Sequence, residues 1–199
     1  MPRTRHFRYC IHLPLAAFAF LLCTSACGIE VNGVTLPEQI KSGQHGTALV
    51  LNGAGMRTKL GFKVYVAALY LPKKNKLAEQ ILHSNQPSQF YMKLLRKLTA
   101  RQFTDSINDA LRETLTPAQS LPLESRLQEL FAVFAAAGEL AAGTEIVIDY
   151  EPRTGTRIGL NGERKANIPG ADFNQALLRM WIGEHPRDAP LKQALLGSS

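Results

Sequence analysis

LNGAGMRTKLGFKVYVAALYLPKK, residues 51–74, joins a glycine-rich segment and a single arginine to a long apolar run. Residues 61–71 are rich in β-branched and aromatic types, which favours a β-strand. Both faces of this strand are apolar, with Phe62, Val64 and Val66 on one and Tyr65, Ala67 and Leu69 on the other. A strand that is apolar on both faces is covered on both, which predicts a central strand of a sheet.

The glycines before this strand predict a tight turn between two strands, with Arg57 at its end. A phosphate-binding loop would need a helix directly after the glycines, because the helix N-terminus holds the phosphate. A strand follows instead, and no Gly-Lys-Ser/Thr triplet is present. We therefore expect no nucleotide site here. On physical grounds alone an arginine in a turn is most often exposed to solvent.

The rest of the chain alternates between groups of strands and groups of helices. Asn32-Gly33 is typical of a two-residue hairpin turn within residues 29–37. Thr99 and Gln102 form a capping-box pattern at the start of a helix over 99–115. Further strands are expected at 47–53, 89–98, 144–152 and 157–162, and further helices at 122–138, 171–183 and 188–197. This order, without regular βαβ alternation, predicts an α+β fold with a largely antiparallel sheet.

Residues 1–26 have the features of a signal peptide: early arginines, a short apolar run and small residues before a cleavage site. We expect export, to the periplasm, of one domain over residues 27–199. Cleavage after Ala26 would expose Cys27, and its lipidation would be the one route to a membrane. Thr24 stands where a lipoprotein signal usually has a leucine-like residue, so we favour a soluble exported protein.

Composition excludes several kinds of site. All three cysteines, Cys10, Cys23 and Cys27, lie in or beside the leader, so the domain has no disulfide or thiolate nucleophile. The histidines after the leader lack ligand-spaced partners, and we expect no metal and no cofactor. The basic residues are scattered, whereas nucleic-acid-binding proteins concentrate theirs, so no nucleic-acid partner is expected. Asp149 and Glu151 share a strand face, without further signs of glycosidase chemistry.

Two segments of the chain resemble the chalcone isomerase superfamily. Residues 51–73 are similar to the family's Gly-Gly-Ala-Gly-x-Arg turn and long central strand, and WIGEHPRDAPLKQALLG (181–197) is similar to its Ile-Gly-Glu-His segment. The resemblance covers Val31 to about Gly197. It implies an open-faced β-sandwich, in which a layer of helices covers a large, mainly antiparallel sheet and a ligand cleft lies between the layers.

The resemblance also implies roles for individual positions. The family's arginine falls on Arg57. The threonine of its central strand falls on Tyr65, a replacement associated with members that bind fatty acids. Its catalytic tyrosine falls on Phe103, and its remaining polar positions fall on Leu94, Ser106, Ala110 and Met180. The polar set that an isomerase needs is therefore mostly lost.

The spacing of one helix leads to the same expectation. Phe103, Ser106, Ile107 and Ala110 share a face, which would form an apolar wall with one hydroxyl. We expect a non-catalytic protein that binds a small amphipathic carboxylate, such as a fatty acid. The candidate ligand-binding residues are Arg57, Tyr65, Phe103, Ser106, Ala110 and Met180. An isomerase (intramolecular lyase) acting on an enone-type substrate, and a structural or partner-binding envelope protein, remain as alternatives; the oligomeric state is not predicted.

Overall fold

The computed structural model describes residues 28–43 and 46–198. The predicted signal peptide, residues 1–26, and Cys27 lie outside the described residues. Within the described part, no helix has both the length and the apolar character needed to cross a bilayer.

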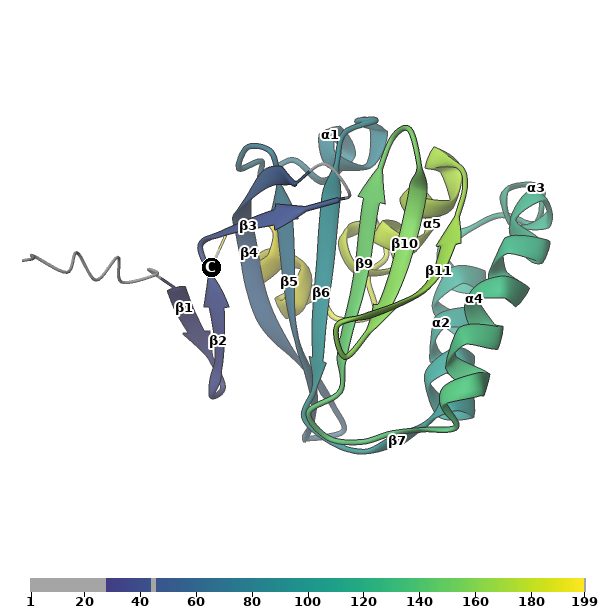
Figure 1. Cartoon of the computed structure of the whole chain (residues 1–199), viewed down its shortest axis with the longest axis horizontal. Helices are drawn as coiled ribbons and strands as arrows, with labels where there is room; N and C mark the ends of the chain where they lie inside the picture. Colours follow the sequence, from purple (N-terminus) through teal and green to yellow (C-terminus); the bar gives the residue numbers. More distant parts are fainter. Residues whose placement is uncertain (1–27, 44–45, 199) are drawn as a thin grey trace, which may run out of the picture.

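A seven-stranded sheet in the order β11-β10-β9-β6-β5-β4-β3 forms the centre of the fold (Figure 1). Every neighbouring pair in it is antiparallel. Its strands are β3 (Gln39–Ser42), β4 (Thr47–Lys59), β5 (Phe62–Leu71), β6 (Ser88–Leu94), β9 (Glu145–Glu151), β10 (Gly155–Leu160) and β11 (Glu163–Ile168). Two small pairs accompany it, β1 (Gly28–Val31) with β2 (Val34–Pro37) and β7 (Leu98–Thr99) with β8 (Glu139–Leu140).

Helices cover one face of this sheet. They are α1 (Ala78–His83), α2 (Ala100–Thr114), α3 (Pro117–Ser120), the 3₁₀ turn η1 (Leu121–Leu123), α4 (Glu124–Ala137), α5 (Ala171–Ile182) and α6 (Ala189–Leu195). Figure 1 shows α5 behind the sheet and α2 and α4 beside its β11 edge. The α+β fold with a large antiparallel sheet is thereby confirmed.

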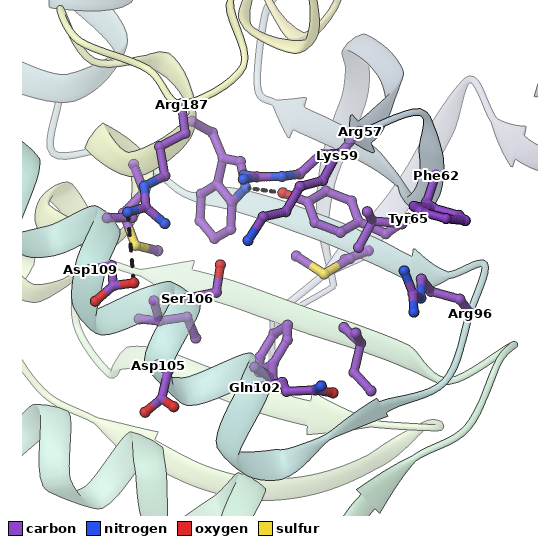
Figure 2. Close-up of a pocket in the computed structure, with 18 of the residues that line it drawn as sticks. Arg57, Lys59, Phe62, Tyr65, Arg96, Gln102, Asp105, Ser106, Asp109 and Arg187 are labelled. Carbon is purple, nitrogen blue, oxygen red and sulfur yellow. Dashed lines mark hydrogen bonds and ion pairs between the residues drawn. The ribbon is translucent and has the colours of Figure 1, made fainter.

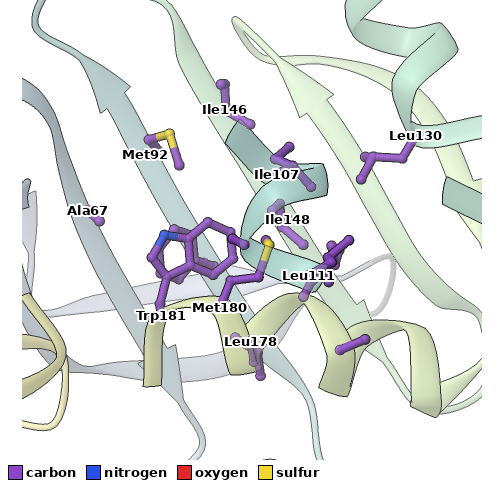
Figure 3. Close-up of a cluster of buried hydrophobic side chains, with 14 of the residues drawn as sticks. Ala67, Met92, Ile107, Leu111, Leu130, Ile146, Ile148, Leu178, Met180 and Trp181 are labelled. Carbon is purple, nitrogen blue, oxygen red and sulfur yellow. The ribbon is translucent and has the colours of Figure 1, made fainter. Parts of the chain in front are cut away.

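The main apolar core lies between the sheet and the helices. Side chains from β5, β6 and β9 meet side chains from α2, α4 and α5 there, as Figure 3 shows for Met92, Ile107, Ile148 and Trp181. A second, smaller core lies on the other face of the sheet, where Val34 and Leu36 of β2 pack over β4 and β5. Residues 65–71 of β5 are buried between the two cores. The prediction of a central strand covered on both faces is confirmed for these residues.

Phe62 is an exception to that prediction. It belongs to the same apolar run, but its side chain is 63% exposed at the first residue of β5. The core layers do not extend over this end of the strand. The apolar run is thus longer than the part of it that the core buries.

Several local predictions are confirmed and others need correction. Thr99 caps α2 with a complete capping box, since its side chain accepts from Gln102 N and its backbone N–H is bonded to the Gln102 side chain. Asn32 and Gly33 form the β1–β2 turn with positive φ angles. The strand expected at 89–98 ends at Leu94. Strand β11 was not predicted, because its sequence ERKANI is mostly polar and has no apolar alternation.

The glycines of the NGAG segment do not form a turn. They lie inside β4, and the turn to β5 comes later, at Leu60-Gly61. A Cβ atom on Gly53 would stand 2.0 Å from the Ala194 carbonyl oxygen, and one on Gly55 would stand 2.7 Å from the Ala194 Cβ. The glycines therefore let α6 lie directly on β4. Asn52 fastens this contact by donating from Nδ2 to the Leu195 carbonyl at 2.8 Å.

We predict that Gly53→Ala destabilises the fold by about 1–3 kcal/mol, because the added methyl forces α6 away from β4. Urea denaturation followed by circular dichroism measures the change. Gly159→Ala is the matched control, since its Cβ would meet its nearest neighbour at an ordinary 3.6 Å. Equal stability of the two variants would contradict the role given to α6.

Candidate functional site

A pocket of about 500 Å³ opens between the β4–β5 end of the sheet and α2 (Figure 2). Its inner wall is buried and mostly apolar, and its mouth is formed by exposed side chains. All six residues singled out from the sequence line it: Arg57, Tyr65, Phe103, Ser106, Ala110 and Met180. The structure thus brings the whole predicted set to one cavity, from β4, β5, α2 and α5.

Arg57 and Tyr65 are direct cross-strand partners in the β4–β5 ladder. Partners in this register point to the same face of the sheet, so the two side chains meet at the pocket. The guanidinium carbon lies 5.9 Å from the centre of the Tyr65 ring, within range of a cation–π contact. Arg57 is therefore a strand residue of a pocket wall, which corrects its expected position in a turn.

Trp181 completes this polar corner from α5. Its indole nitrogen donates to the Tyr65 hydroxyl at 2.9 Å, and both side chains are buried. The Trp181 ring also stacks on Phe90 of β6, with centroids 3.9 Å apart. Stacking fixes the indole, and the fixed indole in turn holds the Tyr65 hydroxyl in one orientation. The hydroxyl hydrogen of Tyr65 remains available for a further acceptor.

Burial raises the pKa of Tyr65 above its ordinary value of 10.0, although the Arg57 charge and the Trp181 hydrogen bond oppose the shift. The side chain is consequently a neutral phenol at neutral pH. A neutral phenol donates a hydrogen bond to an anion, whereas a phenolate would repel it. The corner formed by Arg57 and Tyr65 therefore offers one cationic and one neutral donor.

The wall opposite the sheet comes from α2. Phe103, Ile107 and Ala110 are buried, and Ser106, half-buried, carries the hydroxyl that the spacing predicted. Figure 2 shows the Ser106 side chain pointing toward the space between α2 and the sheet. Phe103 is held from behind by Phe134 of α4, with ring centroids 4.6 Å apart. The buried part of this wall is apolar, and Ser106 adds one hydroxyl to it. Gln102, Asp105 and Asp109 of α2 lie at its exposed edge.

Charges at the pocket differ in how they are neutralised. Arg187 is engaged, because its Nε and Nη2 each donate to Glu113 at 2.6 Å and its Nη2 lies 3.8 Å from Asp109. The hydrogen bond from Arg187 holds the pKa of Glu113 below its ordinary value. Arg57, Lys59 and Arg96 have no carboxylate within 4 Å among the described residues. The pocket therefore has a positive excess near Arg57.

Sequence reasoning missed Lys59, Arg96, Trp181 and Arg187 as pocket residues. Lys59 is two positions from Arg57 on the same strand, so strand alternation could have indicated it. Trp181 neighbours Met180 on α5, and its bulk and polar N–H are typical of a buried hydrogen-bond donor. Arg96 and Arg187 lie in connecting segments, and nothing local in the sequence places them at the pocket.

Asp149 and Glu151 do not form a catalytic pair in the pocket. Asp149 is buried and accepts hydrogen bonds from Ser42, from the Gly43 backbone and from Arg157. These contacts fasten the end of β3 to β9 and β10. Among residues 28–43 and 46–198, no group of three or more His, Cys, Asp or Glu side chains is placed so that it could hold a metal ion.

Comparisons with known proteins agree with this architecture. Residues 28–197 match the protein family described as chalcone isomerase-like. Among solved structures, the chain is similar to the crystal structure of a fatty-acid binding protein from Arabidopsis thaliana, with a TM-score of 0.64 and 15% sequence identity. The match covers 82% of this chain and 92% of that one, and at this identity it shows a common fold. No curated protein sequence gives a significant match.

We predict that Tyr65 makes the fold less stable in alkali. Its pKa is raised in the folded state, so above about pH 10 the unfolded chain releases a proton that the folded chain keeps. Stability therefore falls as the pH rises, and Tyr65→Phe should reduce that fall. The measurement is urea denaturation of both proteins between about pH 8 and pH 11. Other buried tyrosines contribute equally to wild type and to Tyr65→Phe. A difference in the free energy of unfolding between these two proteins that stays the same at every pH would contradict the prediction.

Proposed function

The chain belongs to the chalcone isomerase-like family, and we propose that it is a non-catalytic member that binds a fatty acid or a similar amphipathic carboxylate. One observation carries the proposal: Arg57, without a carboxylate partner among the described residues, and the Tyr65 hydroxyl form a polar corner beside the buried apolar side chains of the pocket. The name of the Arabidopsis protein with the same fold gives secondary support, because it is a fatty-acid binding protein.

The polar corner suits a carboxylate head group. A guanidinium presents two parallel N–H donors that match the two oxygens of a carboxylate. The Tyr65 hydroxyl adds a third donor, and its orientation is fixed by Trp181. Lys59 at the mouth adds positive charge, and it forms no ion pair within the part of the chain that the structure describes. A ligand anion would take the place of the counter-charge that Arg57 lacks among the described residues.

The remaining wall suits an apolar tail. Met92, Phe103, Ile107 and Met180 are buried side chains that face the cavity. The volume of about 500 Å³ lies within the range of ligand pockets in proteins. Each CH₂ group buried there contributes about 0.8 kcal/mol, which is about fourfold in affinity. Methionines adapt to a flexible chain better than rigid side chains do.

The pocket offers little for catalysis. An isomerase that closes an enone requires groups that form a phenolate and polarise a ketone. The wall that faces Arg57 from α2 carries phenylalanine and alanine where the resemblance implies polar groups, and Ser106 is its one hydroxyl. An isomerase remains the second candidate, because Arg57 beside a neutral phenol could still hold an anionic substrate. A structural protein with a filled cleft would not need the open cavity.

Export to the periplasm is part of the proposal and rests on the sequence of residues 1–26. A carrier of a poorly soluble ligand would act there without a disulfide, because the cysteines lie in or beside the leader. The described fold is held by its two apolar cores.

We predict that Arg57→Ala weakens fatty-acid binding by roughly 10- to 100-fold, the value of a charge-assisted hydrogen bond that is lost. Displacement of a fluorescent fatty acid measures the affinity, with Arg153→Ala, an exposed arginine of the β9–β10 turn, as control. A methyl ester should bind wild type weakly and be insensitive to Arg57→Ala. Wild-type affinity in Arg57→Ala would remove Arg57 as the anchor.

We also predict no Arg57-dependent turnover of chalcones. Loss of chalcone absorbance is followed with wild type, Arg57→Ala and buffer alone across a panel of hydroxylated substrates. The proposal expects the three rates to be equal. A wild-type rate clearly above that of Arg57→Ala would favour the isomerase instead.

A further inference from the structure

The mouth of the pocket carries two exposed apolar side chains on one hairpin. Leu60 is 89% exposed and Phe62 is 63% exposed. Both lie at the tip of the β4–β5 hairpin, and both line the pocket. We use the name hairpin tip for Lys59, Leu60, Phe62 and Lys63 together with Arg96. Arg96 comes from the connection between β6 and β7, and it is included because its guanidinium carbon lies 5.4 Å from the Phe62 ring centre.

Leu60 occupies a backbone position that disfavours leucine. The described residues contain three two-residue turns in which both φ angles are positive, at Asn32-Gly33, Leu60-Gly61 and Asn161-Gly162. Asparagine is the favoured first residue of such turns because its side chain tolerates this conformation. Two of the turns follow the rule, and the turn at the pocket mouth has leucine at φ 52° instead. An exposed leucine in a strained backbone position points to a function of its apolar side chain in contact with something outside the protein.

Cationic side chains flank these apolar side chains. Lys59, Lys63 and Arg96 have no carboxylate within 4 Å among the described residues. Lys63 donates to the neutral side chain of Asn32 at 2.6 Å. The nearby Lys97 is balanced by Glu139, 2.9 Å away. An apolar tip flanked by cations is complementary to the surface of an anionic bilayer, where apolar groups insert and cations stay at the head groups.

We propose that the hairpin tip docks the protein on anionic lipid bilayers, with the mouth of the pocket turned toward the membrane. Leu60 and Phe62 enter the interface, and Lys59, Lys63 and Arg96 lie against the lipid phosphates. Docking itself is independent of the proposed function, but the use of docking to load a fatty acid rests on it. This adds a route to the membrane that does not need lipidation of Cys27.

Insertion is tested with Phe62→Trp and vesicles of phosphatidylglycerol and phosphatidylcholine whose acyl chains are brominated. Bromine quenches an indole that reaches the acyl chains. The control is Leu121→Trp, because Leu121 is 68% exposed on η1, away from the pocket lining. All variants keep the same N-terminus, so any membrane affinity of residues 1–27 is common to them. We expect quenching of the introduced indole in Phe62→Trp and none in Leu121→Trp; equal fluorescence changes would overturn the proposal.

The electrostatic part is tested by partitioning onto the same lipids without bromine. Lys63→Ser and Arg96→Ser should each lower the partition coefficient roughly fivefold, since one cation near an anionic surface contributes about that factor. Lys74→Ser, an exposed lysine beyond the opposite end of β5, is the control and should change nothing. Pure phosphatidylcholine vesicles should show no such differences. Equal partitioning of all four proteins onto anionic vesicles would overturn the role of the charges.

Failure of docking can be told apart from failure of the proposed function. Arg57→Ala, made in the Phe62→Trp background, should weaken fatty-acid binding by roughly 10- to 100-fold and keep the quenching by anionic vesicles. Quenching in a protein that binds no fatty acid would support docking and contradict the proposed function. Fatty-acid binding without quenching would support the proposed function and contradict docking on a bilayer. It would then point to a protein partner for the hairpin tip.

Discussion

The cross-strand pairing of Arg57 with Tyr65 determines where the polar corner of the pocket lies. Both residues are held by the β4–β5 ladder, and a register shift follows directly after Arg57. Trp181 reaches the same point from α5 and bonds the tyrosine. Since strand and helix meet at a single hydroxyl, the corner is as rigid as the core behind it. A loop could not present a guanidinium and a phenol with this constancy.

Two long-range contacts keep this arrangement in place. The glycines of β4 admit α6 to direct contact with the strand, and Asn52 bonds the end of α6. Arg187 joins the segment between α5 and α6 to α2 through Glu113 and Asp109. Its charge is thereby neutralised within the protein. Arg57 forms no such ion pair among the described residues. Its charge is therefore available to an anion in the pocket.

Much of the fold could be predicted from local patterns. The apolar faces of residues 65–71 indicated an interior strand, and the Thr99–Gln102 pattern located the start of α2. The residues at the pocket follow from the family resemblance, because an arginine in such a segment is by itself most often exposed to solvent. Its direct pairing with Tyr65 depends on the register of β4, which two bulges adjust and no local pattern specifies.

The parts that could not be predicted depend on residues far apart in the chain. Gly53 is needed because Ala194 approaches it, and nothing near Gly53 in sequence shows this. The polar sequence of β11 forms a strand because β10 supplies its hydrogen bonds. Leu60 could be recognised as unusual only after its positive φ was known.

The central claim is that Arg57 holds the carboxylate of a bound fatty acid. It is tested most directly by ¹³C NMR of a carboxyl-labelled fatty acid titrated with acid on the wild-type protein and on Arg57→Ala. We expect a bound carboxyl resonance whose pKa lies below that of the free acid, since the arginine favours the anion, and a higher pKa in Arg57→Ala. A bound carboxyl group with the same pKa in both proteins would contradict it.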